Sequence, residues 1–244
     1  MERQRPYLFG VLAGLFLAAG LVIAAILLGR TWLKISDGQS VSVTGSARKA
    51  VLSDMIVWKG NFAVEAITLL AAQKQLKDDL VKVEAFLRDK GVTNYIVGTI
   101  AIQERRSTQH RDGETIDRLA GYRLAQTVEI RSPEVDRIAR LDRETVALVE
   151  QGVVFATEAP KFIYTKAGEA KVEMLAEATN DARARADQIA LQGGRAVRQL
   201  SAARMGVFQI TPVHAIQASW DGMNDTSSLE KTITAVVTAT FSLK

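Results

Sequence analysis

The chain has 244 residues, of which 48% are hydrophobic and 24% charged, and it contains no cysteine. Disulfides, thiolate nucleophiles and cysteine-based metal sites are therefore excluded. The formal net charge is +4, but residues 1–34 carry four basic and one acidic residue, so the remaining 27 basic and 26 acidic residues nearly cancel. A near-neutral domain with interspersed charges lacks the basic surface that phosphate binding needs, and no nucleic-acid partner is expected.

The stretch Tyr7–Leu28 contains 22 residues and no charged side chain. As a helix it would extend about 33 Å, which matches the roughly 30 Å hydrocarbon core of a bilayer. The alternative is a cleaved signal peptide, whose apolar region would be about 7–15 residues long and followed by a small-x-small cleavage site. No convincing site of that kind follows Leu28. We therefore expect residues 1–34 to form a short tail and an uncleaved transmembrane anchor.

Small residues recur every four positions within this anchor, at Gly10, Gly14 and Ala18. That spacing lets two transmembrane helices approach closely. Glycine and alanine are also simply common in such helices, so the pattern is open to both interpretations. The basic residues on the two sides of the stretch nearly balance, but the very short N-terminal tail and the long C-terminal part favour a signal anchor with an exported domain.

Hydrophobic periodicity predicts the elements that follow the anchor. Alternating apolar residues predict strands at 39–47, 54–65, 95–104, 119–131, 195–212 and 230–243, and a strand-like segment at 153–165 that is interrupted at Pro160. Apolar residues three and four apart predict three helices: one between a cap at Thr68 and a stop at Gly91, one between Pro133 and Gly152, and one over residues 168–192. The polar segment Arg105–Arg118 is predicted to be a charged loop. Trp58 falls in register with an apolar strand face and is predicted to lie in the core.

The order of elements from Asp54 to about Thr165 is β-α-β-β-α-β, which is the ferredoxin-like pattern. A first strand, a third helix and a C-terminal pair of strands are added to it. We therefore predict an α+β fold in which antiparallel sheet carries helices on one face. No linker is long enough or rich enough in glycine and proline to require two domains, so residues 35–244 are predicted to form one exported domain, with a division into two lobes left open.

Several segments resemble the SIMPL family, in the order in which that family has them. They are Val41–Gly45, Asp54 with Val64–Ala66, Gly121–Arg123 with Gln126–Ile130, Asn180–Ala186 and Thr234–Phe241. The segments span about residues 40–243, and Asn180–Ala186 is the strongest match. The chain is thus similar to bacterial envelope proteins described as periplasmic immunogenic or oxidative-stress-defence proteins. The resemblance implies an exported α+β domain and offers no catalytic residues to carry over.

The anchor and the resemblance together predict a single-pass protein of the bacterial inner membrane, with its C-terminal domain in the periplasm or outside the cell. We expect a non-enzymatic envelope protein that acts through homo-oligomeric assembly, linked by the resemblance to envelope or oxidative stress. The bilayer is expected to contact residues 7–28, and no cofactor or metal is expected. The candidate interface comprises Gly10, Gly14, Ala18, Trp220 and Met223, the last two because exposed aromatics and methionine favour interfaces.

Catalytic motifs are sparse in this sequence. Only His110 and His214 offer an imidazole base, and neither lies near a Gly-x-Ser-x-Gly turn. Glycine-rich phosphate-binding motifs are absent. The alternative function is a small-ligand-binding protein or hydrolase that uses the charged segment 105–118, where Asp112, Glu114 and Asp117 offer carboxylates for acid–base work.

Hydroxyl side chains alternate with apolar ones on the first and last predicted strands. If these strands pair, Ser42, Thr44, Thr238 and Thr240 would share one polar sheet face. Threonine is also favoured in strands for its backbone preference alone, so this face has a second, purely structural interpretation.

Overall fold

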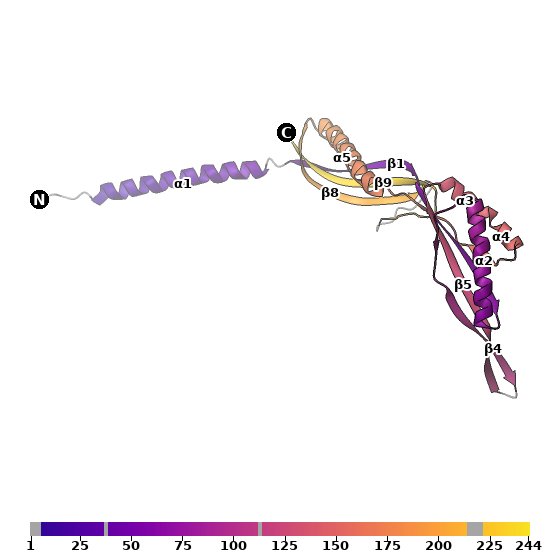
Figure 1. The fold of residues 1–244 in the computed structure, drawn as a ribbon. Coiled ribbons are helices and arrows are strands. Elements are labelled where there is room, and N and C mark those ends of the chain that lie inside the picture. Colours follow the sequence, from indigo (N-terminus) through magenta and orange to yellow (C-terminus); the bar gives the residue numbers. More distant parts are fainter. Residues whose placement is uncertain (1–5, 37–38, 112–113, 214–221) are drawn as a thin grey trace. The chain divides into compact units, whose positions relative to one another are not determined.

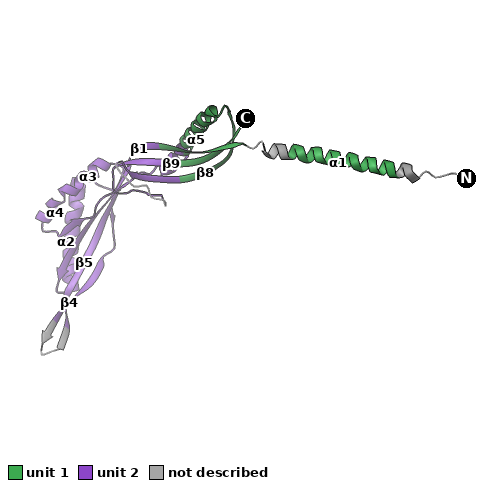
Figure 2. Ribbon diagram, turned by 180° about the vertical axis from the view of Figure 1, so that it is seen from behind, with its two compact units in different colours: residues 1–47, 175–206, 235–244 green, residues 48–174, 207–234 purple. Residues whose placement is uncertain are grey.

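The computed structural model describes residues 6–36, 39–111, 114–213 and 222–244, without the side chains of 6–9, 32–36, 109–111 and 114–116. The chain forms two compact units (Figure 2). Unit 1 comprises residues 1–47, 175–206 and 235–244, and unit 2 comprises residues 48–174 and 207–234. Each unit therefore draws on widely separated parts of the sequence.

The N-terminal helix α1 extends over Pro6–Ser36 (Figure 1). Its segment Gly10–Thr31 is long and apolar enough to cross a membrane, and none of it is buried against the rest of the protein. A helix that is apolar on every side and unburied needs apolar surroundings. This confirms the apolar helix predicted at Tyr7–Leu28, and its position fits a membrane anchor or a signal sequence.

A three-stranded sheet is built from β1 (Ser40–Leu52), β8 (Val197–Pro212) and β9 (Glu230–Leu243) in the order β1-β9-β8. The Leu243 N–H donates to the Gln39 carbonyl at 2.9 Å, so the end of β9 lies beside the start of β1 and the two strands are antiparallel. Alternate residues of β9 face inward, as predicted, and the apolar ones among them that are fully or nearly buried are Ile233, Ala235, Val237, Ala239 and Phe241.

Helix α5 (Ala167–Gln192) packs closely against β1. In unit 1 it buries alanines four residues apart, at Ala178, Ala182, Ala186 and Ala190. A Cβ atom on Gly45 of β1 would lie 2.1 Å from the Ala178 carbonyl oxygen and 2.4 Å from the Ala182 nitrogen. The helix backbone can therefore approach the strand only because position 45 is glycine and the facing residues are alanine.

Unit 2 contains a six-stranded sheet centred on β2 (Met55–Ala66) and β5 (Glu114–Ser132), which pair in antiparallel register from Ile56–Ser132 to Ala66–Tyr122. Its shorter strands are β3 (Ile96–Val97), β4 (Ala101–Arg111), β6 (Phe155–Thr157) and β7 (Lys161–Ile163). The strand order is β3-β5-β2-β6; in addition, β4 pairs with β5 and β7 pairs with β2.

Two helices, α2 (Leu69–Asp89) and α3 (Val135–Glu144), pack against this sheet, and the short helix α4 (Val146–Glu150) packs against α2 (Figure 1). Trp58 of β2 is fully buried among them, and its Nε1 donates to Asp142 Oδ1 at 3.2 Å. The prediction of Trp58 as a core residue is therefore confirmed. The largest buried apolar side chains of this core include Ile56, Trp58, Phe62, Leu76, Leu87, Leu124, Ile130, Ile138 and Leu148.

The helix boundaries follow the local signals in the sequence. Thr68 Oγ1 accepts a hydrogen bond from the Ala71 N–H at 3.3 Å and so caps α2, as predicted. Gly91 after this helix has a φ of +70°, a backbone conformation that glycine adopts most readily. α5 ends before Gly193-Gly194, also as predicted.

Three predictions about secondary structure are wrong. The single strand predicted at 95–104 is divided in two, because β3 ends at Val97 and β4 begins at Ala101. The segment Arg105–Arg118 is largely strand, because β4 and β5 continue as a two-stranded ribbon whose pairs run from Ala101–Ala125 out to Arg111–Glu114. Backbone hydrogen bonds hold this ribbon, so it needs no apolar face. Its sequence therefore lacks the alternation of apolar residues that predicts a strand. The helix predicted between Pro133 and Gly152 is broken at Thr145, so four helices rather than three follow α1 among the residues that the structure describes. Thr145 Oγ1 bonds to the Asp142 carbonyl at 2.8 Å at this break.

Candidate functional site

The residues of the predicted interface lie in two different places. Gly10, Gly14 and Ala18 lie on α1, and a Cβ added to either glycine would meet no other atom within 4 Å. Met223 is 39% exposed, and Trp220 lies outside the described residues. In the part of the chain that the structure describes, these positions are accessible surface, and they remain a prediction as an interface.

The segment that carries Met223 is fixed to β8 by its backbone. The Ile210 N–H donates to the Met223 carbonyl at 2.6 Å, and the Asp225 N–H donates to the Ile210 carbonyl at 2.9 Å. The predicted interface residue Met223 therefore stands on a segment of defined position, immediately after the loop that contains Trp220.

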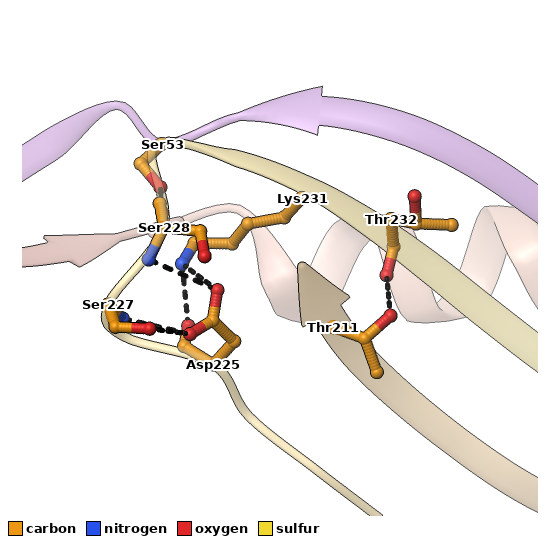
Figure 3. Close-up of polar contacts among 7 residues, drawn as sticks. All are labelled: Ser53, Thr211, Asp225, Ser227, Ser228, Lys231 and Thr232. Carbon is orange, nitrogen blue, oxygen red and sulfur yellow. Dashed lines mark hydrogen bonds and ion pairs between the residues drawn. The ribbon is translucent and has the colours of Figure 1, made fainter. Parts of the chain in front are cut away.

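A buried ion pair completes the attachment of this segment (Figure 3). Lys231 is fully buried at the start of β9, and its Nζ donates to the backbone oxygen of Asp225 at 2.6 Å and to Oδ2 at 3.1 Å. Asp225 Oδ1 accepts the hydroxyl and the N–H of Ser227 at 2.6 and 2.9 Å, and its Oδ2 accepts the Ser228 N–H at 3.2 Å. Ser53 Oγ reaches the Ser228 carbonyl at 3.4 Å.

These contacts determine the charge state of the pair. Burial alone would raise the pKa of Asp225, but the hydrogen bonds from Ser227, Lys231 and Ser228 outweigh it and hold the pKa well below its usual range. A serine–lysine catalytic pair would need a hydroxyl that donates to a neutral amine. Here the Lys231 amine donates to Asp225 and the Ser227 hydroxyl donates to the same carboxylate, which is the arrangement of a structural clamp.

The sequence contains a signal for this clamp that hydrophobic periodicity alone does not reveal. Lys231 occupies the same alternate positions of β9 as Ile233 and Ala235, and these positions face inward. A lysine in a buried register requires a carboxylate partner, because an unpaired buried charge is very costly. Asp225, followed two and three residues later by serines, is the nearest acidic residue that can turn back towards it.

The structure brings the predicted hydroxyl side chains together. Thr44 and Thr238 lie 3.3 Å apart at their hydroxyls, and Thr240 Oγ1 donates to Ser42 Oγ at 3.2 Å. The first and last strands of the domain therefore do pair, and these side chains share one sheet face opposite to the buried residues of β9. The side chains bond mainly to one another across the strands.

The charged ribbon of β4 and β5 shows paired side chains where these are described. Arg105 pairs with Glu65, Arg106 pairs with Glu104 at 3.0 Å, and Thr108 donates to Asp117 at 2.6 Å. The other acid–base candidates of this segment, His110, Asp112 and Glu114, have side chains outside the described residues, as does His214. A catalytic role of this segment stays a prediction.

A cavity of about 420 Å³ in unit 2 is lined by polar side chains, Glu65, Gln75, Asp79 and Arg123. Asp79 is buried on α2 and pairs with Lys82 at 3.2 Å. No group of three or more histidine and acidic side chains suited to a metal ion occurs among the residues that the structure describes. The cavity has room for a small molecule and shows no feature that selects one.

These features define a mixed α and β fold with two antiparallel sheets, which follows an apolar N-terminal helix in the chain. Residues 41–241 match the model of the SIMPL family, which is described as a protein of unknown function (DUF541). Since the match covers most of the chain, the protein belongs to the SIMPL family. A search of curated proteins found no match.

The segment that most resembles the family, Asn180–Ala186, has a clear structural role. Asp181 Oδ2 accepts the Ser46 N–H of β1 at 2.8 Å and pairs with Arg185 at 3.0 Å. The Ser46 N–H and Arg185 lower the pKa of Asp181. Ala182 is fully buried against Gly45. This part of the family pattern therefore serves helix-to-strand packing.

Proposed function

We propose that the protein is a membrane-anchored, non-enzymatic component of the bacterial cell envelope that acts through homo-oligomeric assembly of its SIMPL domain. The observation that carries the proposal is α1, whose 22-residue apolar segment is wholly unburied. An exposed apolar surface of this extent is rare on soluble monomers and marks contact with lipid or protein. An inner-membrane location with an exported domain, and a link to envelope stress, complete the proposal.

Two surfaces support assembly. The small residues Gly10, Gly14 and Ala18 follow one face of α1, and at these three positions no side chain larger than a methyl group keeps a second helix away. Met223 offers a half-exposed apolar side chain on a fixed segment of the domain. A helix contact in the membrane and a domain contact outside it would together give a more stable oligomer. The helix contact raises the local concentration of the domains and so favours the domain contact.

The anchor is tested by extracting membranes that contain the full-length chain with alkaline carbonate. We expect the chain to stay in the membrane fraction with α1 uncleaved, as judged by the mass of the protein. Release of the chain, or a mass that lacks residues 1–34, would contradict the anchor.

Assembly is tested by light scattering of the full-length chain in a mild detergent. We expect a defined oligomer, and we expect Gly10→Ile combined with Gly14→Ile to reduce its mass or its stability to dilution. Gly20→Ile, which lies on α1 away from this row and equally has no atom within 4 Å of an added Cβ, is the matched control. A monomer in the unmodified chain would overturn the assembly proposal.

The ferredoxin-like description of residues 54–165 is also a proposal. It is supported by the order of β2, α2, β4, β5 and α3 along the chain and by the antiparallel pairing of β5 with both β2 and β4. The alternative function, a small-ligand-binding protein or hydrolase using residues 105–118, stays a prediction.

A further inference from the structure

One end of the three-stranded sheet gathers three separate parts of unit 1. The Leu243 N–H donates to the Gln39 carbonyl at 2.9 Å, and Ala196 and Lys244 exchange two backbone hydrogen bonds of 3.2 and 2.9 Å. The start of β1, the end of β9 and the residues just before β8 therefore lie side by side (Figure 1). We call this region the basal end of the sheet.

Basic side chains collect at the basal end. Arg195, Arg198 and Lys244 are exposed, and none of them takes part in an ion pair among the described residues. No acidic residue occurs in the sequence segments 39–52, 188–213 and 231–244, which supply this region. Because the domain as a whole is nearly neutral, this local positive charge is a distinct feature of its surface.

Apolar side chains flank the same basic group. Leu191, in the last turn of α5, is 66% exposed, and Leu200 of β8 is 46% exposed. α5 ends here, and the Arg195 N–H donates a hydrogen bond to the Ala190 carbonyl at 2.8 Å. Exposed leucines next to unpaired arginines form the combination that binds the headgroup region of a membrane, where apolar and anionic groups lie close together.

The length of the chain keeps the basal end near the membrane, whatever the direction of α1. Three peptide units lead from Ser36, the last residue of α1, to Gln39 and can span at most about 11 Å. The apolar segment ends at Thr31, and the five helical residues beyond it add about 7.5 Å. The headgroup layer begins where the apolar segment ends, so the basal end is always within about 20 Å of it.

We propose that the basal end of the sheet rests on the membrane surface, where Arg195, Arg198 and Lys244 bind the phosphates of anionic phospholipids. The inference rests on the proposed anchor and extends it, since the bilayer then holds the domain at a second site. Guanidinium and ammonium groups form charge-assisted hydrogen bonds with phosphate, and they are attracted to an anionic lipid surface. The short connection to α1 keeps the basal end close to the lipid surface. Three basic side chains are therefore enough to bind it.

The test uses the full-length chain in vesicles of phosphatidylcholine, with and without phosphatidylglycerol. Because the chain has no cysteine, a fluorescent label can be placed at a single introduced one, Gln199→Cys at the basal end or Glu177→Cys near the other end of the unit 1 part of α5. Glu177 precedes Gln192 by 15 residues, about 22 Å along the helix. A nitroxide on the lipid headgroup quenches a label that lies at the membrane surface.

We expect the label at position 199 to be quenched more than the label at position 177, and more strongly when phosphatidylglycerol is present. Combining Arg195→Gln, Arg198→Gln and Lys244→Gln should weaken the surface-bound state about fivefold per residue. The control, Lys74→Gln with Arg143→Gln and Lys161→Gln, removes the same charge from exposed positions of unit 2 and should leave the quenching unchanged.

Equal quenching at the two positions would overturn the inference. So would quenching that changes neither with the anionic lipid nor with the triple substitution. Co-flotation of the chain with vesicles after an alkaline wash separates this outcome from failure of the anchor. A chain that stays with the vesicles but shows equal quenching leaves the anchor in place and refutes surface binding. A chain that is washed off refutes the anchor and the surface binding that depends on it.

Discussion

Lys231 and Asp225 show how strongly a single buried charge depends on its partner. The side chain of Lys231 is fully buried and that of Asp225 is 6% exposed. Two charges taken out of water are tolerated only when their attraction and their remaining hydrogen bonds offset the loss of hydration. The three donors from Ser227 and Ser228 supply the hydrogen bonds for the carboxylate.

Asp225→Asn should lower the free energy of unfolding by about 3–5 kcal/mol, because it leaves the Lys231 ammonium buried without a counter-charge. The measurement is urea unfolding of the full-length chain in detergent. Adding Lys231→Met should recover much of the loss, since the unpaired charge is then gone. A loss below about 1 kcal/mol for Asp225→Asn would show that the pair is exposed to water.

Gly45→Ala tests the close approach of α5 to β1. The added methyl group would lie 2.1 Å from a backbone oxygen, so helix and strand must separate, and we expect a loss of about 1–3 kcal/mol or more. Gly168→Ala is the control: it lies in α5 with open space around it, and alanine is the better helix former there. Thermal unfolding followed by circular dichroism compares the two, and equal stability would refute the packing argument.

At the scale of elements, the ribbon of β4 and β5 and the helix α5 are held by different forces. The described ribbon residues from Ala101 to Thr108 are exposed, and backbone pairing with side-chain ion pairs holds them. α5 instead packs a row of alanines against a sheet. Substitutions in the ribbon should therefore cost far less stability than substitutions in the buried face of α5.

Arg106→Ala removes the ion pair with Glu104 at the surface of the ribbon. Both side chains are more than half exposed, so solvent screens the pair, and we expect a change within about 0.5 kcal/mol. Urea unfolding beside Asp225→Asn gives a direct comparison of an exposed and a buried ion pair. A loss larger than about 2 kcal/mol would indicate that the ribbon depends on its charges.

At the scale of the whole molecule, several carboxylates are held ionised by their surroundings. Arg131 lowers the pKa of Glu129, and hydrogen bonds from Thr165 outweigh burial and lower the pKa of Asp54. The pKa of Asp225 is also lowered. A group whose pKa is lower in the folded protein contributes stability above its unfolded pKa and loses it as the pH falls through its folded pKa.

The melting temperature should therefore change little between pH 6 and 8 and fall as the pH drops below about 4, the region in which unfolded carboxylates take up protons. Circular dichroism melts across this range measure the effect. In Asp225→Asn the acid-induced loss should be smaller, because one of the contributing groups is gone. An unchanged melting temperature at pH 3 would contradict the assigned hydrogen bonds.

The sequence by itself determined the features that rest on local pattern. Neighbouring residues determine the apolar length of α1, the cap at Thr68, the glycine stops and the alternation along β9. Each of these features was predicted near its observed position. The resemblance over residues 40–243 likewise agrees with the family match over 41–241. Local chemistry is sufficient where an element's own residues set its conformation and its buried face.

Only the tertiary structure decided the features that depend on a distant partner. The charged segment after Arg105 is a strand because β5 pairs with it, and its own composition gives no apolar alternation. Gly45 is required because α5, more than 130 residues later, lies against it. The basal end of the sheet likewise exists only where Gln39, Ala196 and Lys244 meet, since backbone pairing between distant segments brings their charges together.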